Sequence, residues 1–493
     1  MLTRRQLLEL GAATTLLPMA CRGRESATGP VVLNDIHSKL NATRVSRVAR
    51  PDGFEQLVTS IEEAGRRGER VSVSGGRHSM GGQQFGTETL NIDCRSLSRV
   101  LSLDPDRGLI EVEAGIEWPQ LIDWCLANQT GGPAWGIRQK QTGADRLTLG
   151  GALASNIHGR GLGYAPIVGD VDSFQLVGPD GKVHRCSREE NPELFGLVIG
   201  GYGLFGVVYS VVLKLSPRRK LERVVEVRSV DGLAEAFERR IAAGFLYGDF
   251  QFKTDETAPD YLQTGVFSCY RPVADDAGVP KRQKRLPRSA WKRLLELAHF
   301  DKSRAYEEYS SYYLSTNGQI HWSDTHQLSY YLDGYHELID KRSRNEAPAS
   351  EMISEVYVPR DRLASFMLDT AKAFRQAQVN VIYGTVRLIE KDSVTFLPWA
   401  RQSWACVVFN LHVRHTPAGI EQAERQFRLL IDLAIEQGGS YFLTYHRWAS
   451  RNQVRLCYPQ LGEFLRKKRE WDPEERFQSD WYRHYRTIFA SDL

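Results

Sequence analysis

The sequence has 493 residues, too many for one hydrophobic core of ordinary size, so two or more lobes are expected. Hydrophobic residues make up 42% and charged residues 25%, values that exclude a disordered or fibrous chain. The 64 Lys and Arg residues nearly balance the 60 Asp and Glu residues, and a net charge of +4 does not indicate a nucleic-acid partner or an anionic surface.

The first thirty residues resemble an export signal. Arg4 and Arg5 precede an apolar run that is too short to span a membrane comfortably, and small residues follow it. The two arginines resemble the twin-arginine signal, which exports proteins that have already folded. Cys21 loosely resembles a lipoprotein attachment site, although Pro18 stands where that pattern usually has Leu. We expect a periplasmic or membrane-anchored protein. The anchor would be either a lipid on Cys21 or a signal that is retained, and the alternative is a soluble protein whose signal is cleaved.

From about residue 42 to residue 217, short β-branched runs alternate with helical stretches. A Pro-Asp start and apolar residues at Leu57, Ile61 and Ala64 predict a helix within 51–70, and a strand over 71–75 follows. The same patterns predict, in order, two strands joined by a turn over 99–115, a helix over 118–129, a hairpin over 171–187 and a strand within 202–217. This part of the chain is therefore α+β and rich in strands.

The composition changes after Pro217. Residues 275–305 are basic and are expected to be irregular. The patterns then predict a strand and a helix within 354–374, a strand over 404–415, an amphipathic helix over 419–439, and a tail within 461–482 that is helical up to an Asp-Pro break. A second lobe of strands and helices is the natural inference.

The cysteines beyond Cys21 are widely scattered, and none forms a CxxC pair. This spacing indicates neither a zinc site nor a compact disulfide framework, so no metal is expected. Buried thiols are the expectation for all six, which are Cys94, Cys125, Cys186, Cys269, Cys406 and Cys457.

Three glycine-rich stretches, over 74–82, 141–170 and 196–208, are separated by predicted strands. The first presents many backbone N–H groups with little side-chain bulk, an arrangement that can wrap a pyrophosphate. It matches neither GxGxxG with a helix directly behind it nor the Walker pattern, so taken alone it is equally consistent with a plain turn. Three such stretches together favour a long flat ligand, and a dinucleotide over a monophosphate.

The motifs SGGRHSMGG, EVEAG, TGADRLTLGGALASNIHGRG and LFGLVIGGYGLFGVVYSVVLKLSP resemble, in order and spacing, the flavin-binding domain of the vanillyl-alcohol-oxidase / p-cresol-methylhydroxylase (PCMH) family. The later EVYVPRDRL, YGTVRLIEKD and DPEERFQSDW are similar to its aldonolactone and alditol oxidase branch, and GGALASNIHGR is similar to its decaprenylphosphoryl-ribose oxidase branch. The resemblance implies a two-lobed α+β fold. It consists of a PCMH-type FAD-binding domain over 35–217, an α+β cap (substrate) domain over 218–454, and a C-terminal segment over 455–493 that returns to the FAD domain.

The resemblance also implies FAD and assigns residues to it. His78 stands where alditol and aldonolactone oxidases bond a histidine to the flavin 8α-methyl group, whereas decaprenylphosphoryl-ribose oxidase lacks this histidine. His78 is therefore a candidate for covalent attachment, the alternative being a neutral histidine beside the ring or the pyrophosphate. The resemblance also implies that His158 lines the flavin, and the alternative is that His158 is a structural histidine. The other implied FAD-binding residues are Ser74, Gly75, Gly76, Arg77, Ser79, Met80, Gln83, Thr142, Gly143, Gly151, Ser155, Gly159, Val207 and Val208.

Three residues are candidates for catalysis by the same resemblance. Arg387 matches a pocket arginine that alditol oxidases carry in a Glu-x-Arg pair, but Thr385 stands at the glutamate position. A surface charge at a strand edge is the alternative for Arg387. His446 lies where the family often has a lysine, and it can serve as a base at neutral pH. Arg160 replaces a lysine of the decaprenylphosphoryl-ribose branch and is a candidate contact for an anionic substrate group.

These implications describe an exported FAD-dependent oxidoreductase that acts on small molecules. It would oxidise a CH–OH group of a sugar, polyol or aldonolactone by hydride transfer to flavin N5, with oxygen as the acceptor. One alternative is a dehydrogenase or epimerase component that acts on a lipid-linked or cell-envelope sugar with another acceptor. A non-catalytic envelope protein on the same fold is an alternative of a different class.

Overall fold

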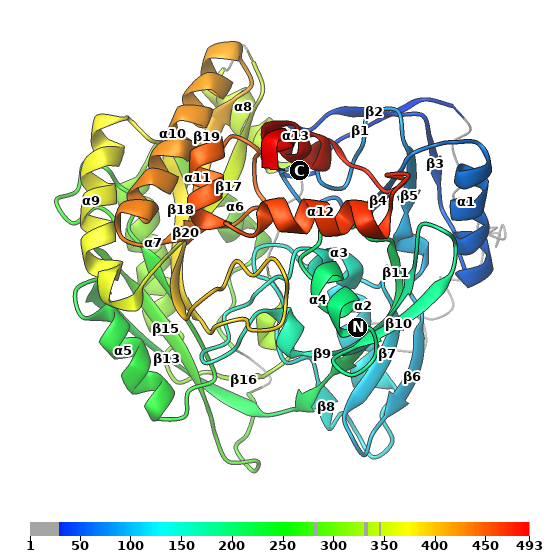
Figure 1. Ribbon diagram of the computed structural model, residues 1–493. Helices are drawn as coiled ribbons and strands as arrows, with labels where there is room; N and C mark the ends of the chain where they lie inside the picture. The colour runs from blue at the N-terminus through cyan, green and yellow to red at the C-terminus, as the bar shows by residue number, and fades with distance from the viewer. Residues whose placement is uncertain (1–28, 281–282, 330–333, 345–346, 493) are drawn as a thin grey trace, which may run out of the picture.

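The computed structural model describes residues 29–280, 283–329, 334–344 and 347–492 (Figure 1). Nearly all of the predicted export signal, including Cys21, lies outside these residues. Among the helices that are described, none combines the length and the apolar character needed to cross a bilayer. The described chain is an α+β structure with two lobes, as the sequence predicts.

The first lobe begins with a small parallel sheet in the order β3-β5-β4. Helix α1 (Phe54–Arg66) connects β3 to β4 and buries Leu57, Ile61 and Ala64, which confirms the predicted helix. The strands are β3 (Arg47–Ala49), β4 (Val71–Ser74) and β5 (Leu90–Asp93), and β1 (Val31–Leu33) pairs with β2 (Thr43–Val45) beside them.

A five-stranded antiparallel sheet completes the first lobe, in the order β10-β9-β11-β7-β6. Its strands are β6 (Val100–Asp104), β7 (Leu109–Glu113), β9 (Val171–Val177), β10 (Val183–Ser187) and β11 (Val207–Lys214). Its helices are α2 (Trp118–Ala127), α3 (Leu149–Ala154) and α4 (Pro192–Val198). The predicted turn, helix, hairpin and final strand are thus confirmed. A short pair, β8 (Trp135–Gly136) with β12 (Ser216–Pro217), leads out of this lobe.

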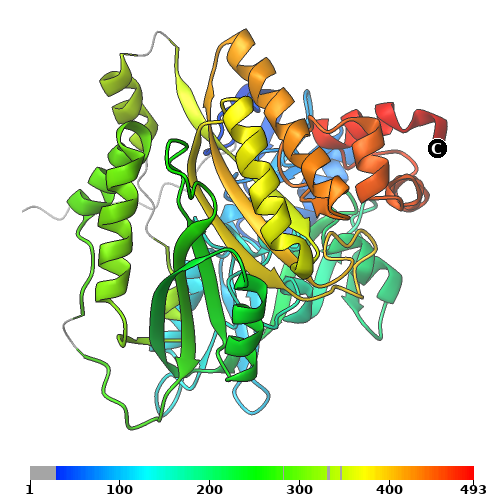
Figure 2. The ribbon, with the colours of Figure 1, turned by 90° about the vertical axis from the view of Figure 1, so that its left-hand side faces the viewer.

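The second lobe is an eight-stranded antiparallel sheet in the order β16-β13-β15-β14-β18-β19-β17-β20. The strands are β13 (Lys220–Ser229), β14 (Tyr247–Phe252), β15 (Thr264–Pro272), β16 (Ile320–Trp322), β17 (Ala349–Val358), β18 (Val381–Ile389), β19 (Trp404–Arg414) and β20 (Ser440–Tyr441). Figure 2 shows helices on both sides of this sheet. On one side lie α5 (Leu233–Ala242), α9 (Leu363–Gln376) and α10 (Pro417–Glu436), and on the other α6 (Arg288–Phe300), α7 (Lys302–Ser315) and α8 (Tyr335–Ser343).

The prediction that residues 275–305 are irregular is wrong over much of its length, because α6 and the start of α7 lie there. The residues Trp291, Leu294, Leu295 and Ala298 are spaced as one helical face, and all four line the cavity described below. Basic residues between them mask this short apolar stripe in the sequence. The high charge of the segment therefore belongs to a helix that is exposed on its outer side.

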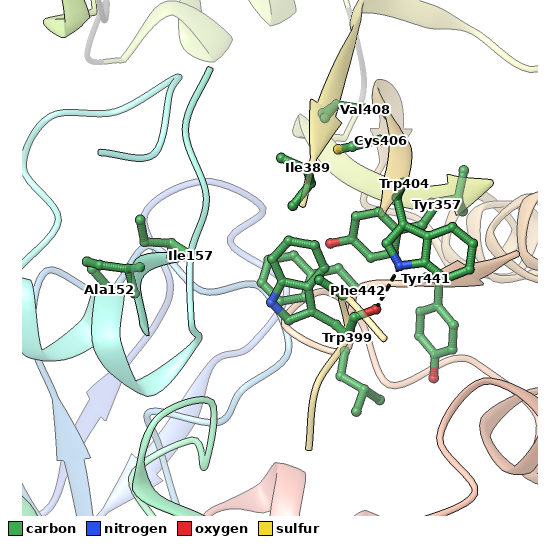
Figure 3. Close-up of a cluster of buried hydrophobic side chains, with 14 of the residues drawn as sticks. Ala152, Ile157, Tyr357, Ile389, Trp399, Trp404, Cys406, Val408, Tyr441 and Phe442 are labelled. Carbon is green, nitrogen blue, oxygen red and sulfur yellow. Dashed lines mark hydrogen bonds between the residues drawn. The ribbon is translucent and has the colours of Figure 1, made fainter. Parts of the chain in front are cut away.

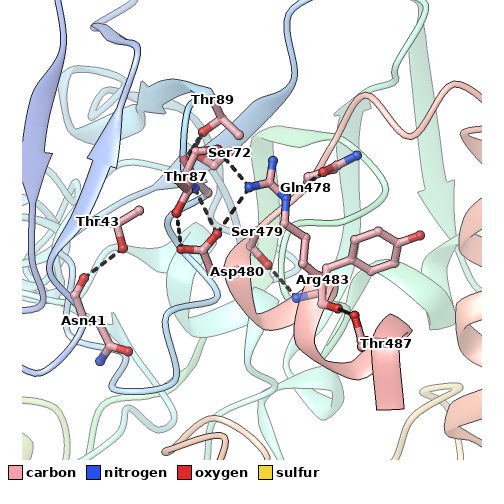
Figure 4. Close-up of polar contacts among 12 residues, drawn as sticks. Asn41, Thr43, Ser72, Thr87, Thr89, Gln478, Ser479, Asp480, Arg483 and Thr487 are labelled. Atoms are coloured by element: carbon pink, nitrogen blue, oxygen red, sulfur yellow. Dashed lines mark hydrogen bonds and ion pairs between the residues drawn. The ribbon is translucent and has the colours of Figure 1, made fainter. Parts of the chain in front are cut away.

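The C-terminal segment lies against the first lobe. It contains α11 (Arg451–Cys457), α12 (Leu461–Trp471), which ends at the predicted Asp-Pro break, and α13 (Asp480–Ile488). Val71 of β4 donates its N–H to the Arg476 carbonyl at 2.7 Å and accepts from Gln478 N at 2.8 Å. Figure 4 shows the Asp480 carboxylate, which accepts from both the N–H and the hydroxyl of Thr87 at 2.9 Å. The C-terminal segment thus adds to the small parallel sheet that the N-terminal part of the chain forms.

One buried hydrophobic cluster runs through both lobes (Figure 3). Ala152 and Ile157 belong to the first lobe, and Trp399 and Trp404 to the second. The Trp399 indole donates to the Asn156 carbonyl at 2.9 Å, across the boundary. The shared core therefore fixes how the two lobes face one another. The six described cysteines are buried and unpaired, as expected.

Candidate active site

A cavity of about 670 Å³ lies between the two lobes. The three glycine-rich stretches line it from the first lobe. One face of the eight-stranded sheet, together with α6 and α7, lines it from the second. Its volume lies within the range typical of small-molecule and cofactor sites.

The structure brings nearly all of the predicted flavin residues together in this cavity. The lining residues among them are Ser74, Gly75, Gly76, Arg77, His78, Ser79, Met80, Gln83, Thr142, Gly143, Gly151, Ser155, His158, Val207 and Val208. Gly159 is not among the lining residues. A Cβ there would lie 2.5 Å from the Lys140 carbonyl oxygen, so this glycine permits close backbone packing behind the cavity.

The glycine loops leave bare backbone at the cavity wall. A Cβ on Gly75 would lie 2.0 Å from Thr148 Oγ1, and one on Gly76 would lie 2.4 Å from the Arg146 carbonyl oxygen. The first and second loops therefore pack against one another with no room for side chains. Gly143 has φ +93°, and a Cβ there would meet no heavy atom within 4 Å, so its backbone borders open space. Such a wall fits a ligand that lies flat against peptide groups.

Several buried polar atoms in the cavity wall lack a hydrogen-bond partner among the described residues. A buried polar group without a partner costs about 1–3 kcal/mol, so these atoms indicate a polar ligand. They are the Oε1 atoms of Gln83, Gln84 and Gln251, the Nε atoms of Arg160 and Arg387, and Oδ1 of Asn410. The bare backbone and the unpaired polar atoms together fit a dinucleotide and a polar substrate.

His78 lies between His37 and the second loop. Its Nδ1 is 2.8 Å from His37 Nε2, and its Nε2 is 3.0 Å from the Arg146 carbonyl oxygen. Burial and the nearby His37 lower the pKa of His78 to about 3, although the bond to Arg146 opposes them. The imidazole is therefore neutral at pH 7. Since a carbonyl can only accept, Nε2 carries the proton and Nδ1 presents its lone pair toward His37.

Glu355 of β17, which the sequence analysis did not single out, also lines the cavity. Its Oε1 accepts from His158 Nε2 at 2.8 Å and from the Tyr357 hydroxyl at 2.5 Å, and its Oε2 accepts from the Tyr445 hydroxyl at 3.3 Å. Burial raises the pKa of this carboxyl, but His158, the Tyr357 hydroxyl and Arg387 outweigh burial and hold the pKa below its usual value. Glu355 is thus an ionised carboxylate in a buried part of the cavity wall.

The register of the sheet places Glu355 level with the position where alditol oxidases have a glutamate. Thr385 of β18 and Glu355 of β17 both pair with Val408 of β19, from its two sides. The three residues therefore form one row on the same face of the sheet. Arg387, two residues beyond Thr385, lines the cavity with 6% exposure on an interior strand, so it is not a surface charge at a sheet edge.

Arg160 marks a second polar part of the cavity. Its Nη1 lies 3.9 Å from Oδ2 of Asp249 in β14. Tyr309 and Tyr313 of α7 line the same cavity, with ring centroids 4.5 Å apart. Cationic and aromatic groups of this kind can bind an anionic group or stack on a sugar ring.

The structure does not bring His446 together with these residues. His446 is buried, stacks on Trp448 with ring centroids 4.2 Å apart, and lines a second cavity with Arg447 and His484. Burial lowers the pKa of His446 to about 4. Its neighbour Tyr445 lines the main cavity instead, because residues 442–450 form a turn from which adjacent side chains diverge.

Comparison with known proteins agrees with this geometry. A family model described as an FAD binding domain matches residues 45–187. Residues 45–187 are an FAD binding domain. The cofactor that the glycine loops of this FAD domain hold is therefore FAD, and the bare backbone and unpaired polar atoms of the cavity fit it.

Three curated relatives each match less than two fifths of this chain. Cytokinin dehydrogenase 8 of Oryza sativa subsp. indica is 29% identical over 209 residues, which cover 39% of this chain and 37% of the relative. Decaprenylphosphoryl-beta-D-ribose oxidase of Mycolicibacterium smegmatis is 27% identical over 183 residues, covering 36% and 38%. L-gulono-1,4-lactone dehydrogenase of Mycobacterium tuberculosis is 30% identical over 194 residues, covering 39% and 42%. The chain spans about two fifths of the length of these curated relatives.

Proposed function

We propose that this protein is an FAD-dependent oxidoreductase that oxidises a CH–OH group of a sugar, polyol or aldonolactone. The observation that carries the proposal is that the loops of the FAD domain and the cap residues Glu355 and Arg387 line one cavity. FAD, when bound, accepts the electrons of such an oxidation. The protein has to orient the hydroxyl-bearing carbon and remove the hydroxyl proton.

Tyr445 and Glu355 are suited to take that proton. Tyr445 lines the cavity, and its phenol hydroxyl donates to the ionised Glu355. A substrate hydroxyl can give its proton to Tyr445 while Tyr445 gives its own to Glu355, so no free charge forms on the phenol. Arg387 supplies a buried positive charge beside the negative charge that develops as the proton leaves.

We further propose that His78 carries FAD through a covalent bond. Its neutral imidazole and the lone pair of Nδ1 are the form that such a bond requires. His37, in contact with that nitrogen, is the group placed to position the ring. We also propose that oxygen is the electron acceptor, which the resemblance to alditol oxidases supports. Export by the N-terminal signal is part of the same proposal, and the paired Arg4 and Arg5 support it.

A lipid-linked sugar is the second candidate substrate. The apolar face of α6 lines the cavity with Trp291, Leu294 and Leu295, while Arg160 lies in the same wall. An apolar wall near a cation suits a phosphate that carries an alkyl chain. A relative named decaprenylphosphoryl-beta-D-ribose oxidase points in the same direction.

Anaerobic flavin reduction tests the proposal. The purified full chain is mixed without oxygen with separate panels of free sugars, polyols, aldonolactones and polyprenyl-phosphate sugars, and loss of the visible flavin absorption is followed. Bleaching by a free hydroxyl compound, and recovery of colour in air, is the expected result. Bleaching by the lipid-linked panel alone would favour the second candidate. A yellow protein whose flavin is reduced by no compound of any panel would contradict both candidate substrate classes. A colourless protein would favour the non-catalytic alternative.

A further inference from the structure

Three histidines surround the carboxylate of Glu351 where α6, α8 and the large sheet meet. Glu351 of β17 and His412 of β19 are directly paired across the two strands. His299 lies in the last turn of α6, and His336 in the first turn of α8. His299 Nε2 lies 3.3 Å, and His412 Nδ1 3.4 Å, from Glu351 Oε1, while His336 Nδ1 lies 2.8 Å from Oε2. Side chains from three separate elements, α6, α8 and β19, thus converge on one carboxylate of β17.

These groups are buried, and two of their atoms are unsatisfied. The side chains of His299 and Glu351 are 4% exposed, that of His336 8% and that of His412 17%. Among the described residues, neither His299 Nε2 nor Glu351 Oε2 makes a hydrogen bond of acceptable geometry, although each lies close to a polar atom. Buried polar atoms that approach one another without bonding are costly unless another group binds them.

We propose that His299, His412 and Glu351 bind a divalent transition-metal ion of the zinc class. Their ligand atoms all lie within 4.8 Å of one another. In a tetrahedral site with zinc–ligand distances of about 2.0–2.1 Å, neighbouring ligand atoms are about 3.3 Å apart. The two measured separations from Glu351 Oε1, 3.3 Å and 3.4 Å, match this spacing.

The donor set also selects the kind of metal. Imidazole nitrogen with one carboxylate suits zinc, whereas calcium and magnesium prefer oxygen donors throughout. His336 contacts the second oxygen of Glu351 and is therefore a positioning residue that orients the carboxylate. Cysteine spacing alone indicated no metal site in the sequence. The histidines and the glutamate of this site are 113 positions apart at their extremes, and only the fold brings them together.

The metal would fasten α6 to the sheet. Apart from the His299 side chain, the residues of α6 are at least partly exposed, so its packing against the rest of the protein is weak for a helix that lines the cavity. A metal bound by His299 and by two strands would anchor the C-terminal end of α6 beside the cavity. The role is structural, and it does not depend on the proposed function.

Metal content of the full chain tests the proposal. The protein is produced with a histidine-free affinity tag, incubated with zinc, dialysed and analysed by inductively coupled plasma mass spectrometry. About one zinc per chain is expected, falling to near none in His299→Ala, His412→Ala and Glu351→Gln. His415→Ala is the matched control, since His415 follows β19 directly but contacts Ser350 at 2.8 Å rather than Glu351. It should keep its zinc.

A second readout uses the wild-type chain and so does not depend on how the variants fold. Copper(II) replaces zinc in metal-free protein, and its electron paramagnetic resonance spectrum is recorded. Hyperfine splitting from two imidazole nitrogens is expected. The proposal is overturned if the wild type retains less than about a tenth of an equivalent of zinc and copper shows no nitrogen splitting, or if folded ligand variants hold as much metal as His415→Ala.

Discussion

Replacing Glu355 by glutamine would test the centre of the proposed active site. The side chain keeps its size but loses its charge, and an NH₂ group replaces one of the two accepting oxygens. Three donors point at this carboxylate, from His158, Tyr357 and Tyr445. Glutamine can accept at one oxygen only, so one or two donors would face an NH₂ group instead.

The magnitude follows from those contacts. Hydrogen bonds to a charged group contribute about 1.5–3 kcal/mol each, so losing one or two of them should lower the free energy of unfolding by about 1.5–6 kcal/mol. Loss of the proton acceptor beyond Tyr445 should also slow flavin reduction by about 10²-fold or more. Glu226→Gln is the control, because Glu226 lies on the same sheet with its side chain 45% exposed and should change stability by less than about 0.5 kcal/mol.

Urea unfolding followed by tryptophan fluorescence measures the first quantity, and stopped-flow flavin reduction measures the second. Both effects are expected in Glu355→Gln and neither in Glu226→Gln. A Glu355→Gln enzyme that unfolds within about 0.5 kcal/mol of the wild type and is reduced within about threefold of its rate would refute the assigned role of Glu355.

Three further predictions concern the flavin bond, acid stability and the C-terminal segment. After acid precipitation, the yellow flavin colour should stay in the pellet of the wild type. It should go to the supernatant completely in His78→Ala and partly in His37→Ala. A yellow pellet from His78→Ala would contradict a covalent bond at His78. Burial lowers the pKa of His484 to about 4, below its unfolded value, so its neutral form contributes stability that is complete above pH 6.5 and is lost as the pH falls toward 4. Between pH 7.5 and pH 5, the free energy of unfolding should therefore fall by about 1–2 kcal/mol less in His484→Asn than in the wild type, as measured by thermal unfolding. An equal fall in both proteins would contradict this role of His484. Lys468 and Asp472 pair at 2.6 Å with at most 1% exposure, so Asp472→Asn should cost about 3–5 kcal/mol in urea unfolding, and Lys468→Met should restore part of it in the double variant.

The sequence predicts the first lobe well because its signals are local. A glycine loop directly after a β-branched run, a hairpin turn or a helix start depends on neighbouring residues alone. The loop with His78 and the glycine-rich stretch around Ser155 can therefore be assigned to one ligand from the sequence. Gly159 shows the limit of this approach, because a glycine that lines a ligand and one that packs against backbone look alike in sequence.

The second lobe depends on pairings between distant residues, and the sequence predicts it less well. Strand β14 lies between β15 and β18, which are more than a hundred residues apart, and no local pattern indicates that order. The prediction that His446 belongs to the active site is wrong for a related reason. The direction of a side chain in a turn depends on the surrounding structure, and not on a period of two or of 3.6 residues.

The row Glu355, Val408, Thr385 shows why a motif can be incomplete while its chemistry is retained. Neighbouring strands lie about 4.8 Å apart, so the carboxylate of this protein starts about 10 Å from the position that the Glu-x-Arg pattern of alditol oxidases would give it. A substrate hydroxyl that reacts beside Glu355 and Tyr445 must then lie at a different place along the cavity wall than one that reacts beside residue 385. The absence of glutamate at Thr385 thus argues against transferring polyol specificity to this protein, and it does not argue against oxidation of a hydroxyl group.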